Sequence, residues 1–151
     1  MKLHLGCGNI DLGTEWVHVD RCELLDHVDV QHDLNVIPWP FDDDSVDYIK
    51  AIDLVEHLDD VVVFMDECWR ILRPGGTLEI QAVSWQSENL WRDPTHKRGF
   101  HRDTFLYFDP RTDWGDRYGR LYTQFHWRVV CVDDDGDSVR AEMMPRKGST
   151  V

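Results

Sequence analysis

Apolar and polar residues alternate in short runs along the first half of the chain, and each run ends at a glycine, an acid or another turn residue. This period of two predicts half-buried β-strands. The predicted strands cover residues 2–5, 16–20, 28–32, 46–52 and 77–83. Between the last two, apolar residues from Val61 to Leu72 recur at helical spacing behind Asp59 and Asp60, which are suitable cap residues. The pattern predicts one helix there, ended by the Arg73–Gly76 turn.

The end of the chain carries a second pattern of alternation. Residues 122–132 and 138–144 alternate and are joined by an acidic Asp-Gly turn at 133–137, which predicts an antiparallel hairpin. Residues 10–15 are too few for an ordinary crossover helix, so we expect a loop or a single helical turn there. These elements predict an α/β fold in a single domain, 1–151, with few helices near its N-terminus.

The connection 84–121 is long and rich in aromatic residues. Connections of this length are usually functional or disordered, and an aromatic composition is not typical of disorder. We expect the connection to leave the carboxyl edge of the sheet as a lid or substrate insertion, with residues 85–108 closing over a bound ligand.

The charge of the chain is strongly acidic and unevenly placed. The formal net charge is −13 at pH 7, yet residues 92–128 hold eight Lys and Arg against five acids. An acidic body repels a polyphosphate backbone, which argues against general nucleic-acid binding. The basic stretch is better suited to holding a single anionic group.

Neither membrane insertion nor disulfide bonding is expected. The longest apolar run, Val61–Met65, is far too short to cross a bilayer, and we see no secretion signal before the first strand. The four cysteines form no CxxC pair, so we expect reduced thiols in a cytoplasmic protein rather than disulfides or zinc ligands.

The first strand opens directly into Gly6-Cys7-Gly8, and the second strand ends at Asp20. Glycine adopts backbone angles closed to other residues and lets a ligand lie against the main chain. Nucleotide-like cofactors bind at the carboxyl edge of open α/β sheets, where an acid at the tip of the second strand accepts hydrogen bonds from both ribose hydroxyls. These residues therefore predict a cofactor site.

Five segments follow one another in order: LHLGCGN, WVHVD, HDLNVIPWPFDDDSVDYI, DLVEHL and ECWRILRPGGTLEI. Their succession over residues 2–83 resembles the class I S-adenosylmethionine-dependent methyltransferases of the small "type 11" kind. The resemblance implies a Rossmann-like sheet of parallel strands closed by an antiparallel C-terminal hairpin, with S-adenosyl-L-methionine as the cofactor. It implies that His4, in place of the usual acid, contacts the cofactor, and that Gly6, Cys7 and Gly8 lie along its methionyl-ribose portion. It further implies that Asp20 binds the ribose hydroxyls. Asp33 and Leu34 would contact the adenine, and Ile52 and Asp53 would lie near the methyl group.

Two histidines are candidates for acid–base catalysis. His96 lies in the segment DPTHKR, which resembles a substrate-side segment of the family, and the unperturbed pKa of histidine lies near neutrality. A local lock of the loop by Asp93 and His96 is the alternative. His57, just after the fourth strand, is the second candidate, and its alternative is to begin the following helical region.

The basic residues of the same connection are candidates for substrate binding. Lys97, Arg98 and Arg102 are expected to face the acceptor and to hold an anionic or strongly polar group. A metal held by His96 and His101 with Asp93 or Asp103 is a weaker hypothesis because the ligand spacing follows no known pattern, so no metal site is predicted.

The preferred hypothesis is an enzyme that transfers the methyl group of S-adenosylmethionine to a small, polar or anionic acceptor. The alternative is a catalytically inactive module that binds S-adenosylmethionine or S-adenosylhomocysteine, or serves in assembly. Three features motivate it: His4 in place of the usual acid, the small size, and the missing N-terminal cover, since no helix is expected before the first strand to cover the cofactor. A nicotinamide-dependent oxidoreductase fits poorly, because Asp11 stands where the third glycine of GxGxxG belongs. The missing cover and exposed aromatic residues also motivate a homodimer.

Overall fold

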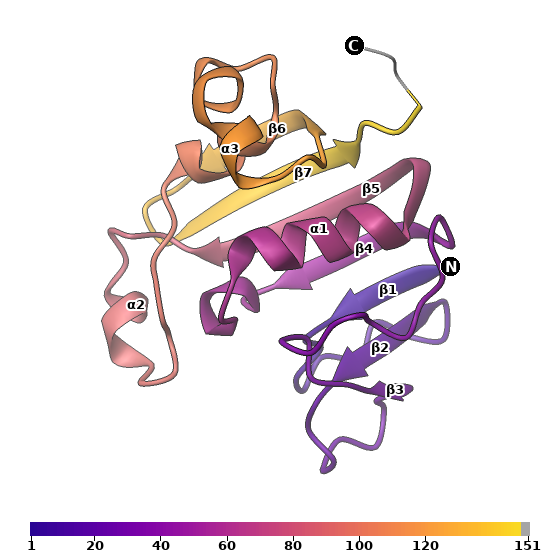
Figure 1. Ribbon diagram of the computed structural model, residues 1–151. Helices are drawn as coiled ribbons and strands as arrows, with labels where there is room; N and C mark the ends of the chain where they lie inside the picture. Colours follow the sequence, from indigo (N-terminus) through magenta and orange to yellow (C-terminus); the bar gives the residue numbers. More distant parts are fainter. Residues whose placement is uncertain (149–151) are drawn as a thin grey trace.

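The computed structural model describes residues 1–148, which form one seven-stranded sheet in the order β3-β2-β1-β4-β5-β7-β6 (Figure 1). Its strands are β1 (Lys2–Leu5), β2 (Trp16–Asp20), β3 (Val30–Gln31), β4 (Val46–Ile52), β5 (Leu72–Val83), β6 (Trp127–Asp134) and β7 (Ser138–Pro145). The pairs among β1 to β5 are parallel, whereas β7 pairs antiparallel with both β5 and β6. The predicted Rossmann-like sheet with an antiparallel C-terminal hairpin is therefore confirmed.

Three strands differ from their predicted ranges by two or more residues at one end at least. β3 is shorter than the predicted 28–32 because it is an edge strand that pairs with β2 alone. β5 begins five residues early, because Leu72 already pairs with Val46 before the turn that was expected to precede the strand. β6 begins at Trp127 because the residues from Arg120 to Tyr122 complete a helical turn instead.

The predicted helix is α1 (Val61–Ile71), which crosses β4 and β5 on one side of the sheet (Figure 1). Asp60 caps it, its carboxylate accepting the backbone N–H groups of Val62 and Val63 at 2.8 and 3.1 Å. Its apolar stripe is buried against the sheet. The other helical segments are short: η1 (Val55–His57), α2 (Glu88–Arg92), η2 (Arg102–Phe108), the π-helical turn η3 (Gly115–Gly119) and α3 (Arg120–Tyr122).

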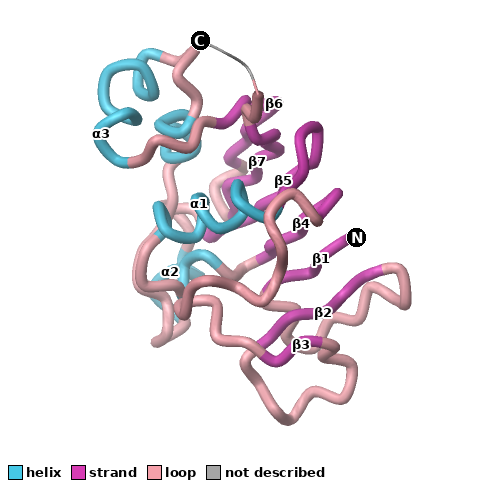
Figure 2. Tube along the Cα trace, turned by 45° about the vertical axis from the view of Figure 1, so that its right-hand side comes forward, coloured by secondary structure: helices cyan, strands magenta, loops and turns pink. Residues whose placement is uncertain are grey.

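The labelled helices lie together on one side of the sheet, as Figure 2 shows. Residues 10–15 contain only a turn, as expected, so no helix connects β1 to β2. The side chains of the opposite face suit an uncovered surface: Tyr48 donates to Glu79 at 2.6 Å, and Lys50 pairs with the same carboxylate at 3.3 Å. Trp16 packs edge-on to Tyr48, so aromatic rings shield the strands while polar groups remain hydrated. Among the helices of residues 1–148, none is long and apolar enough to span a membrane.

The connection after β5 consists of two parts. Its first part is a loop closed at its base, where Phe100 exchanges backbone hydrogen bonds with Val83 and Trp85 at 2.9 Å each. Its second part is anchored in the core, because Phe105 is fully buried and Phe108 nearly so. Phe100 itself is buried in the same core. Only the tip of the first loop therefore faces the ligand-binding edge of the sheet, and the rest of the connection does not. Closure of residues 85–108 over a cofactor stays a prediction.

His4 should make the stability of the protein depend on pH. Its side chain is 2% exposed between Trp16 and His18, and burial, with His18 and Lys50 nearby, lowers its pKa to about 4. In the unfolded chain the His4 imidazole is protonated below about pH 6.5, whereas in the folded protein it stays neutral until the pH approaches 4. The free energy of unfolding, at its full value above pH 6.5, should therefore fall by about 3 kcal/mol as the pH drops to 4.

Urea unfolding of the wild type and of His4→Asn at pH 7 and pH 4.5 measures this effect. We expect the loss between the two pH values to be clearly smaller in the variant, which has no imidazole to protonate. Equal losses in both proteins would show that other groups cause the acid sensitivity.

Candidate functional site

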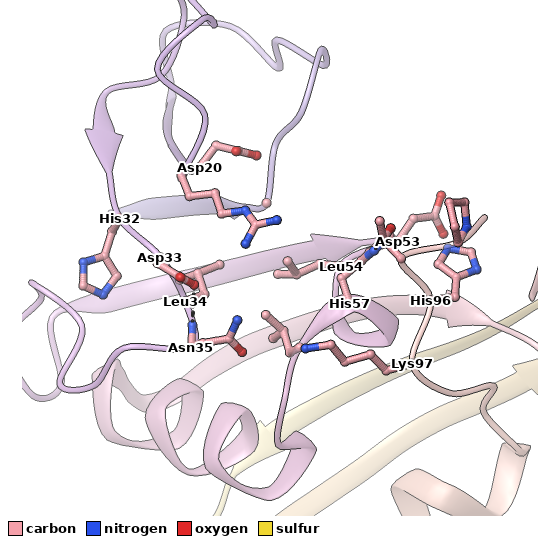
Figure 3. A pocket seen from close by; sticks show the side chains of 15 residues that line it. Asp20, His32, Asp33, Leu34, Asn35, Asp53, Leu54, His57, His96 and Lys97 are labelled. Atoms are coloured by element: carbon pink, nitrogen blue, oxygen red, sulfur yellow. Dashed lines mark hydrogen bonds between the residues drawn. The ribbon is translucent and has the colours of Figure 1, made fainter.

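A cavity of about 640 Å³ opens at the carboxyl edge of the parallel strands (Figure 3). Volumes of this size are typical of small-molecule and cofactor sites. One end is formed by residues that follow β1, β2 and β3, and the other by residues that follow β4 together with the tip of the loop 93–97. Its lining residues are Gly6, Asp20, Arg21, His32, Asp33, Leu34, Asn35, Asp53, Leu54, His57, Leu58, Pro94, Thr95, His96 and Lys97.

The glycine turn and Asp20 form the first end as one unit. Gly6 and Gly8 have φ angles of 61° and 50°, the left-handed region that favours glycine. Asp20 stabilises this turn, because its carboxylate accepts the Gly8 N–H at 3.0 Å and the Cys22 N–H at 2.9 Å. A Cβ atom on Gly6 would lie 2.6 Å from Leu54, so only glycine leaves this wall of the cavity intact.

Asp33, Leu34 and Asn35 form the neighbouring wall. The carboxylate of Asp33 accepts the backbone N–H of Asn35 at 3.0 Å, and the Asn35 side chain accepts the N–H of Asp59 at 2.9 Å. The Leu34 carbonyl accepts the indole N–H of Trp39 at 3.1 Å. These bonds hold the wall in place from both sides, so its shape does not depend on a ligand.

The opposite end brings together residues from two distant segments. The Thr95 hydroxyl donates to Asp93 Oδ1 at 2.7 Å and lies 2.9 Å from His57 Nδ1. A hydroxyl has one proton and a carboxylate only accepts, so His57 Nδ1 donates to Thr95 and the lone pair of the neutral ring is on Nε2. Burial, together with neighbouring His96, lowers the pKa of His57 and favours this neutral form.

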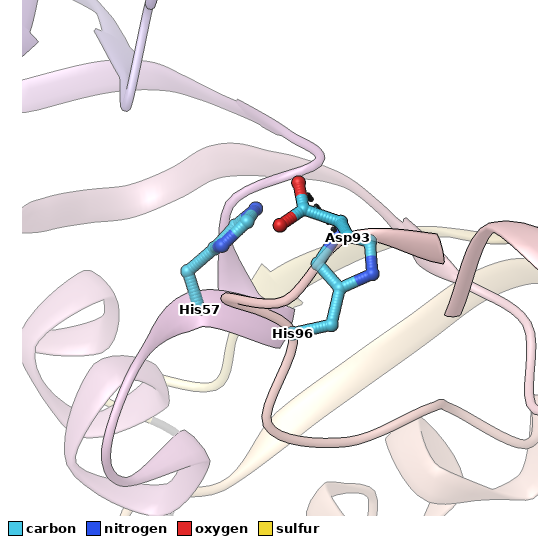
Figure 4. A group of neighbouring side chains, drawn as sticks. All are labelled: His57, Asp93 and His96. Atoms are coloured by element: carbon cyan, nitrogen blue, oxygen red, sulfur yellow. Dashed lines mark ion pairs between the residues drawn. The ribbon is translucent and has the colours of Figure 1, made fainter. Parts of the chain in front are cut away.

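His96 lies against the same group. Its ring centroid is 4.7 Å from that of His57, and its Nε2 is 3.7 Å from Asp93 Oδ2 (Figure 4). Asp93 also accepts the backbone N–H of Thr95 at 2.8 Å and its carbonyl accepts that of His96 at 3.3 Å. Of the alternative, a local lock by Asp93 and His96, the Asp93 part is present through its carbonyl and Oδ1, whereas His96 takes part only through its backbone N–H.

The basic residues predicted to bind substrate are engaged elsewhere. Lys97 lines the cavity but pairs with the Asp59 carboxylate, and Arg98 donates to the carbonyls of Leu58 and Asp59 at 2.6 and 3.0 Å. Arg102 lies 4.0 Å from its neighbour Asp103, away from the cavity lining. Lys97 and Arg98 therefore hold the loop 93–98 against the segment before α1.

Sequence reasoning and structure agree on part of the cavity lining. The predicted residues that line it are Gly6, Asp20, Asp33, Leu34, Asp53, His57, His96 and Lys97, whereas His4, Cys7, Gly8, Ile52, Arg98 and Arg102 do not. The His4 ring packs among aromatic residues of β2, so its placement gives no support to a cofactor contact. Cys7 is buried, and burial raises the pKa of its thiol to about 11, which leaves it unreactive.

The lining residues that the sequence analysis missed are Arg21, His32, Asn35, Leu54, Leu58, Pro94 and Thr95. Most of them directly follow or precede a predicted site residue in the chain. Their signal was therefore their position beside a predicted site residue, and not a motif of their own.

Comparison with known proteins agrees with this geometry. Residues 7–80 match the family model described as a methyltransferase domain. A protein of Mycolicibacterium smegmatis, named as a probable S-adenosylmethionine-dependent methyltransferase, is 45% identical over 75 residues, which are 47% of this chain and 29% of that protein. Residues 7–80 are therefore similar to the methyltransferase domain of S-adenosylmethionine-dependent enzymes. The chain spans less than a third of the length of this curated relative.

Solved structures show the same fold. A S-adenosylmethionine-dependent methyltransferase of Archaeoglobus fulgidus aligns with a TM-score of 0.67 and 16% identity, covering 95% of this chain and 85% of that one. The complex of the Haloferax volcanii Trm112 methyltransferase activator with a methyltransferase matches with a TM-score of 0.63 and 15% identity, covering 95% and 81%.

The cofactor of this family is S-adenosylmethionine, and the first end of the cavity fits it. Two carboxylates, Asp20 and Asp33, offer acceptors for hydroxyl and amino groups. Leu34 and Leu54 offer apolar walls, and the backbone at Gly6 lies open because it carries no side chain. These features are the hydrogen-bond acceptors, apolar surfaces and open space that an adenosyl group requires.

Proposed function

We propose that this protein transfers a methyl group from S-adenosylmethionine to a small polar acceptor. The observation that carries the proposal is the continuity of one cavity, from the glycine turn and Asp20 at one end to His57 and His96 at the other. When bound, S-adenosylmethionine supplies a methyl group on a positively charged sulfur, which keeps the electron pair of the broken S–C bond as the acceptor's lone pair forms the new bond.

The residues of the chain hold the two reactants in line. In this proposal Asp20 binds the ribose hydroxyls, Asp33 and Leu34 bind the adenine, and Asp53 lies beside the transferred group. Holding reactants in the reactive geometry contributes several kcal/mol of barrier lowering, roughly 7–11 kcal/mol at the extreme. General-base roles for His57 and His96 stay predictions from the sequence.

The acceptor preference differs from the one that the sequence suggested. Lys97 and Arg98 already bind groups of this chain, so we do not carry forward an anionic acceptor. The second end of the cavity instead presents polar side chains, which support a small polar acceptor. The homodimer and the cytoplasmic location likewise stay predictions; light scattering measures the first.

The proposal is tested by incubating the protein with S-adenosylmethionine and a panel of small amines, alcohols, thiols and carboxylates, and by measuring S-adenosylhomocysteine. We expect product that depends on one class of acceptor. Calorimetry should also show binding of S-adenosylhomocysteine and none of NAD. Cofactor binding without turnover across the panel would favour the inactive binding module instead, and binding of NAD alone would contradict both.

A further inference from the structure

We infer that His57, Asp93 and His96 form a binding site for a first-row divalent metal such as Zn²⁺ at the acceptor end of the cavity. One potential ligand atom from each of the three residues lies within 4.8 Å of the others (Figure 4). No metal site was predicted from the sequence, because the candidate ligands there, His96 and His101 with Asp93 or Asp103, follow no known spacing. That His57 lies beside the loop 93–97 is visible only in the structure.

The distances are close to those of a coordinated ion. Two donors bound to a tetrahedral zinc at about 2.0–2.1 Å lie roughly 3.4 Å apart. His96 Nε2 and Asp93 Oδ2 are already 3.7 Å apart, and the imidazole ring of His57 lies beside that of His96. Small side-chain rotations therefore suffice to bring three donors onto one ion.

The hydrogen bonds around the cluster orient its donors. Thr95 accepts the Nδ1 proton of His57, which leaves the Nε2 lone pair free to bind an ion. Ligating histidines usually donate their second ring N–H to such a partner, which fixes the tautomer. The lock occupies Asp93 Oδ1 and His57 Nδ1, but it gives no hydrogen bond to Asp93 Oδ2 or to the His96 ring.

His96 provides a second, independent observation. Its side chain is only 9% exposed, and its Nδ1 has no hydrogen-bond partner among residues 1–148. Buried polar atoms without partners are rare and costly, and Nδ1 is not the nitrogen that faces Asp93, so no hydrogen bond of the described residues assigns the His96 ring a structural role.

The charge around the cluster also favours a cation. A second cavity of about 280 Å³ adjoins it and is lined by four carboxyl groups, those of Asp53, Glu56, Asp93 and Asp137, with no Lys or Arg in its lining. Glu56 is 1% exposed, and its Oε2 has no partner in the described chain. A divalent ion offsets this charge, and two imidazoles with one carboxylate suit zinc and its neighbours better than Mg²⁺.

The role of the ion rests on the proposed function. Three protein ligands leave coordination positions open, and a polar group of the acceptor replaces water at one of them. The metal then positions the acceptor and supplies the activation otherwise predicted of a lone imidazole base. Metal binding itself does not depend on methyl transfer.

The test is titration of the metal-free protein with Co²⁺, followed by visible absorption, and with Zn²⁺ by calorimetry. We expect one ion per chain, with an affinity at least about 10-fold lower in His57→Ala, His96→Ala and Asp93→Asn. Asp93→Asn is the most informative variant, because its amide oxygen still accepts the Thr95 hydrogen bonds while the anionic donor is lost. His101→Ala, a histidine on the same connection outside the cluster, is the matched control and should bind like the wild type.

Three results would overturn the inference: no stoichiometric binding, binding unchanged in the three variants, or an equal loss in the control. Calorimetry with n-butylamine tests whether an ammonium group of a ligand, and not a metal ion, binds beside these carboxylates. Amine binding without metal binding would show that the carboxylates hold an ammonium group instead. S-adenosylhomocysteine binding is measured on the same samples. If it is intact while the metal does not bind, the metal site is wrong and the proposed function survives; the reverse leaves the metal site and removes the proposed function.

Discussion

Glu67→Ala should destabilise the protein by about 2–3 kcal/mol, because it leaves the Trp39 N–H without its acceptor while Arg70 keeps Asp43 as a charged partner at 2.8 Å. The Glu67 carboxylate is 7% exposed and accepts the Trp39 N–H at 2.7 Å and two Arg70 N–H groups at 2.8 and 2.9 Å. Burial opposes its ionisation, but the hydrogen bonds from Arg70 and Trp39 outweigh burial and lower its pKa.

Losing the Glu67 carboxylate should also affect the cofactor site. Arg70 also donates to the carbonyls of Trp39 and Phe41 at 3.1 and 2.8 Å, so the pair fastens the proline-rich loop to α1. The same loop follows the wall formed by Leu34. We therefore expect weaker S-adenosylhomocysteine binding together with lower stability.

Urea unfolding measures the stability of Glu67→Ala against two comparison proteins. Glu67→Gln keeps an acceptor for Trp39 and should lose less. Glu88→Ala removes an exposed partner of Arg92 at 3.3 Å and should change stability by no more than about 0.5 kcal/mol. A loss below about 1 kcal/mol for Glu67→Ala would mean that the loop does not depend on this pair.

Asp20→Ala should weaken S-adenosylhomocysteine binding by about 2–3 kcal/mol, or roughly 30- to 150-fold. In the proposed function Asp20 holds both ribose hydroxyls through charge-assisted hydrogen bonds. The same carboxylate accepts the Gly8 and Cys22 N–H groups, so its removal also loosens the glycine turn. Both effects act on affinity in the same direction.

Calorimetry compares Asp20→Ala with Asp26→Ala and Asp20→Asn. Asp26 is an exposed acid outside the cavity lining, so its variant controls for the lost charge and should bind as the wild type does. Asp20→Asn keeps one acceptor oxygen and should lie between the other two. An unchanged dissociation constant for Asp20→Ala would show that Asp20 does not contact the ribose.

Parts of the fold could be predicted because their signals are local. The strand β2 ends at Asp20 and the turn opens at Gly6 for reasons contained in a few neighbouring residues: alternation, an acid at the tip and glycine's freedom at positive φ. The helix α1 was equally predictable, since Asp60 and the apolar stripe behind it specify its start and its buried face. The order of such segments then sufficed to indicate the family.

The sequence by itself thus determined the order of the strands along the chain, the helix α1, the glycine turn with Asp20 and the class of fold. Only the tertiary structure decided which basic side chains are available to a ligand. Lys97 pairs with Asp59 and Arg98 donates to the Leu58 carbonyl, because segments about 40 residues apart in the chain pack together. It also decided that His57 meets the loop of Asp93, where the position of a loop tip depends on contacts with the whole sheet edge. Side-chain partners of this kind follow from how distant segments pack, and no local pattern encodes them.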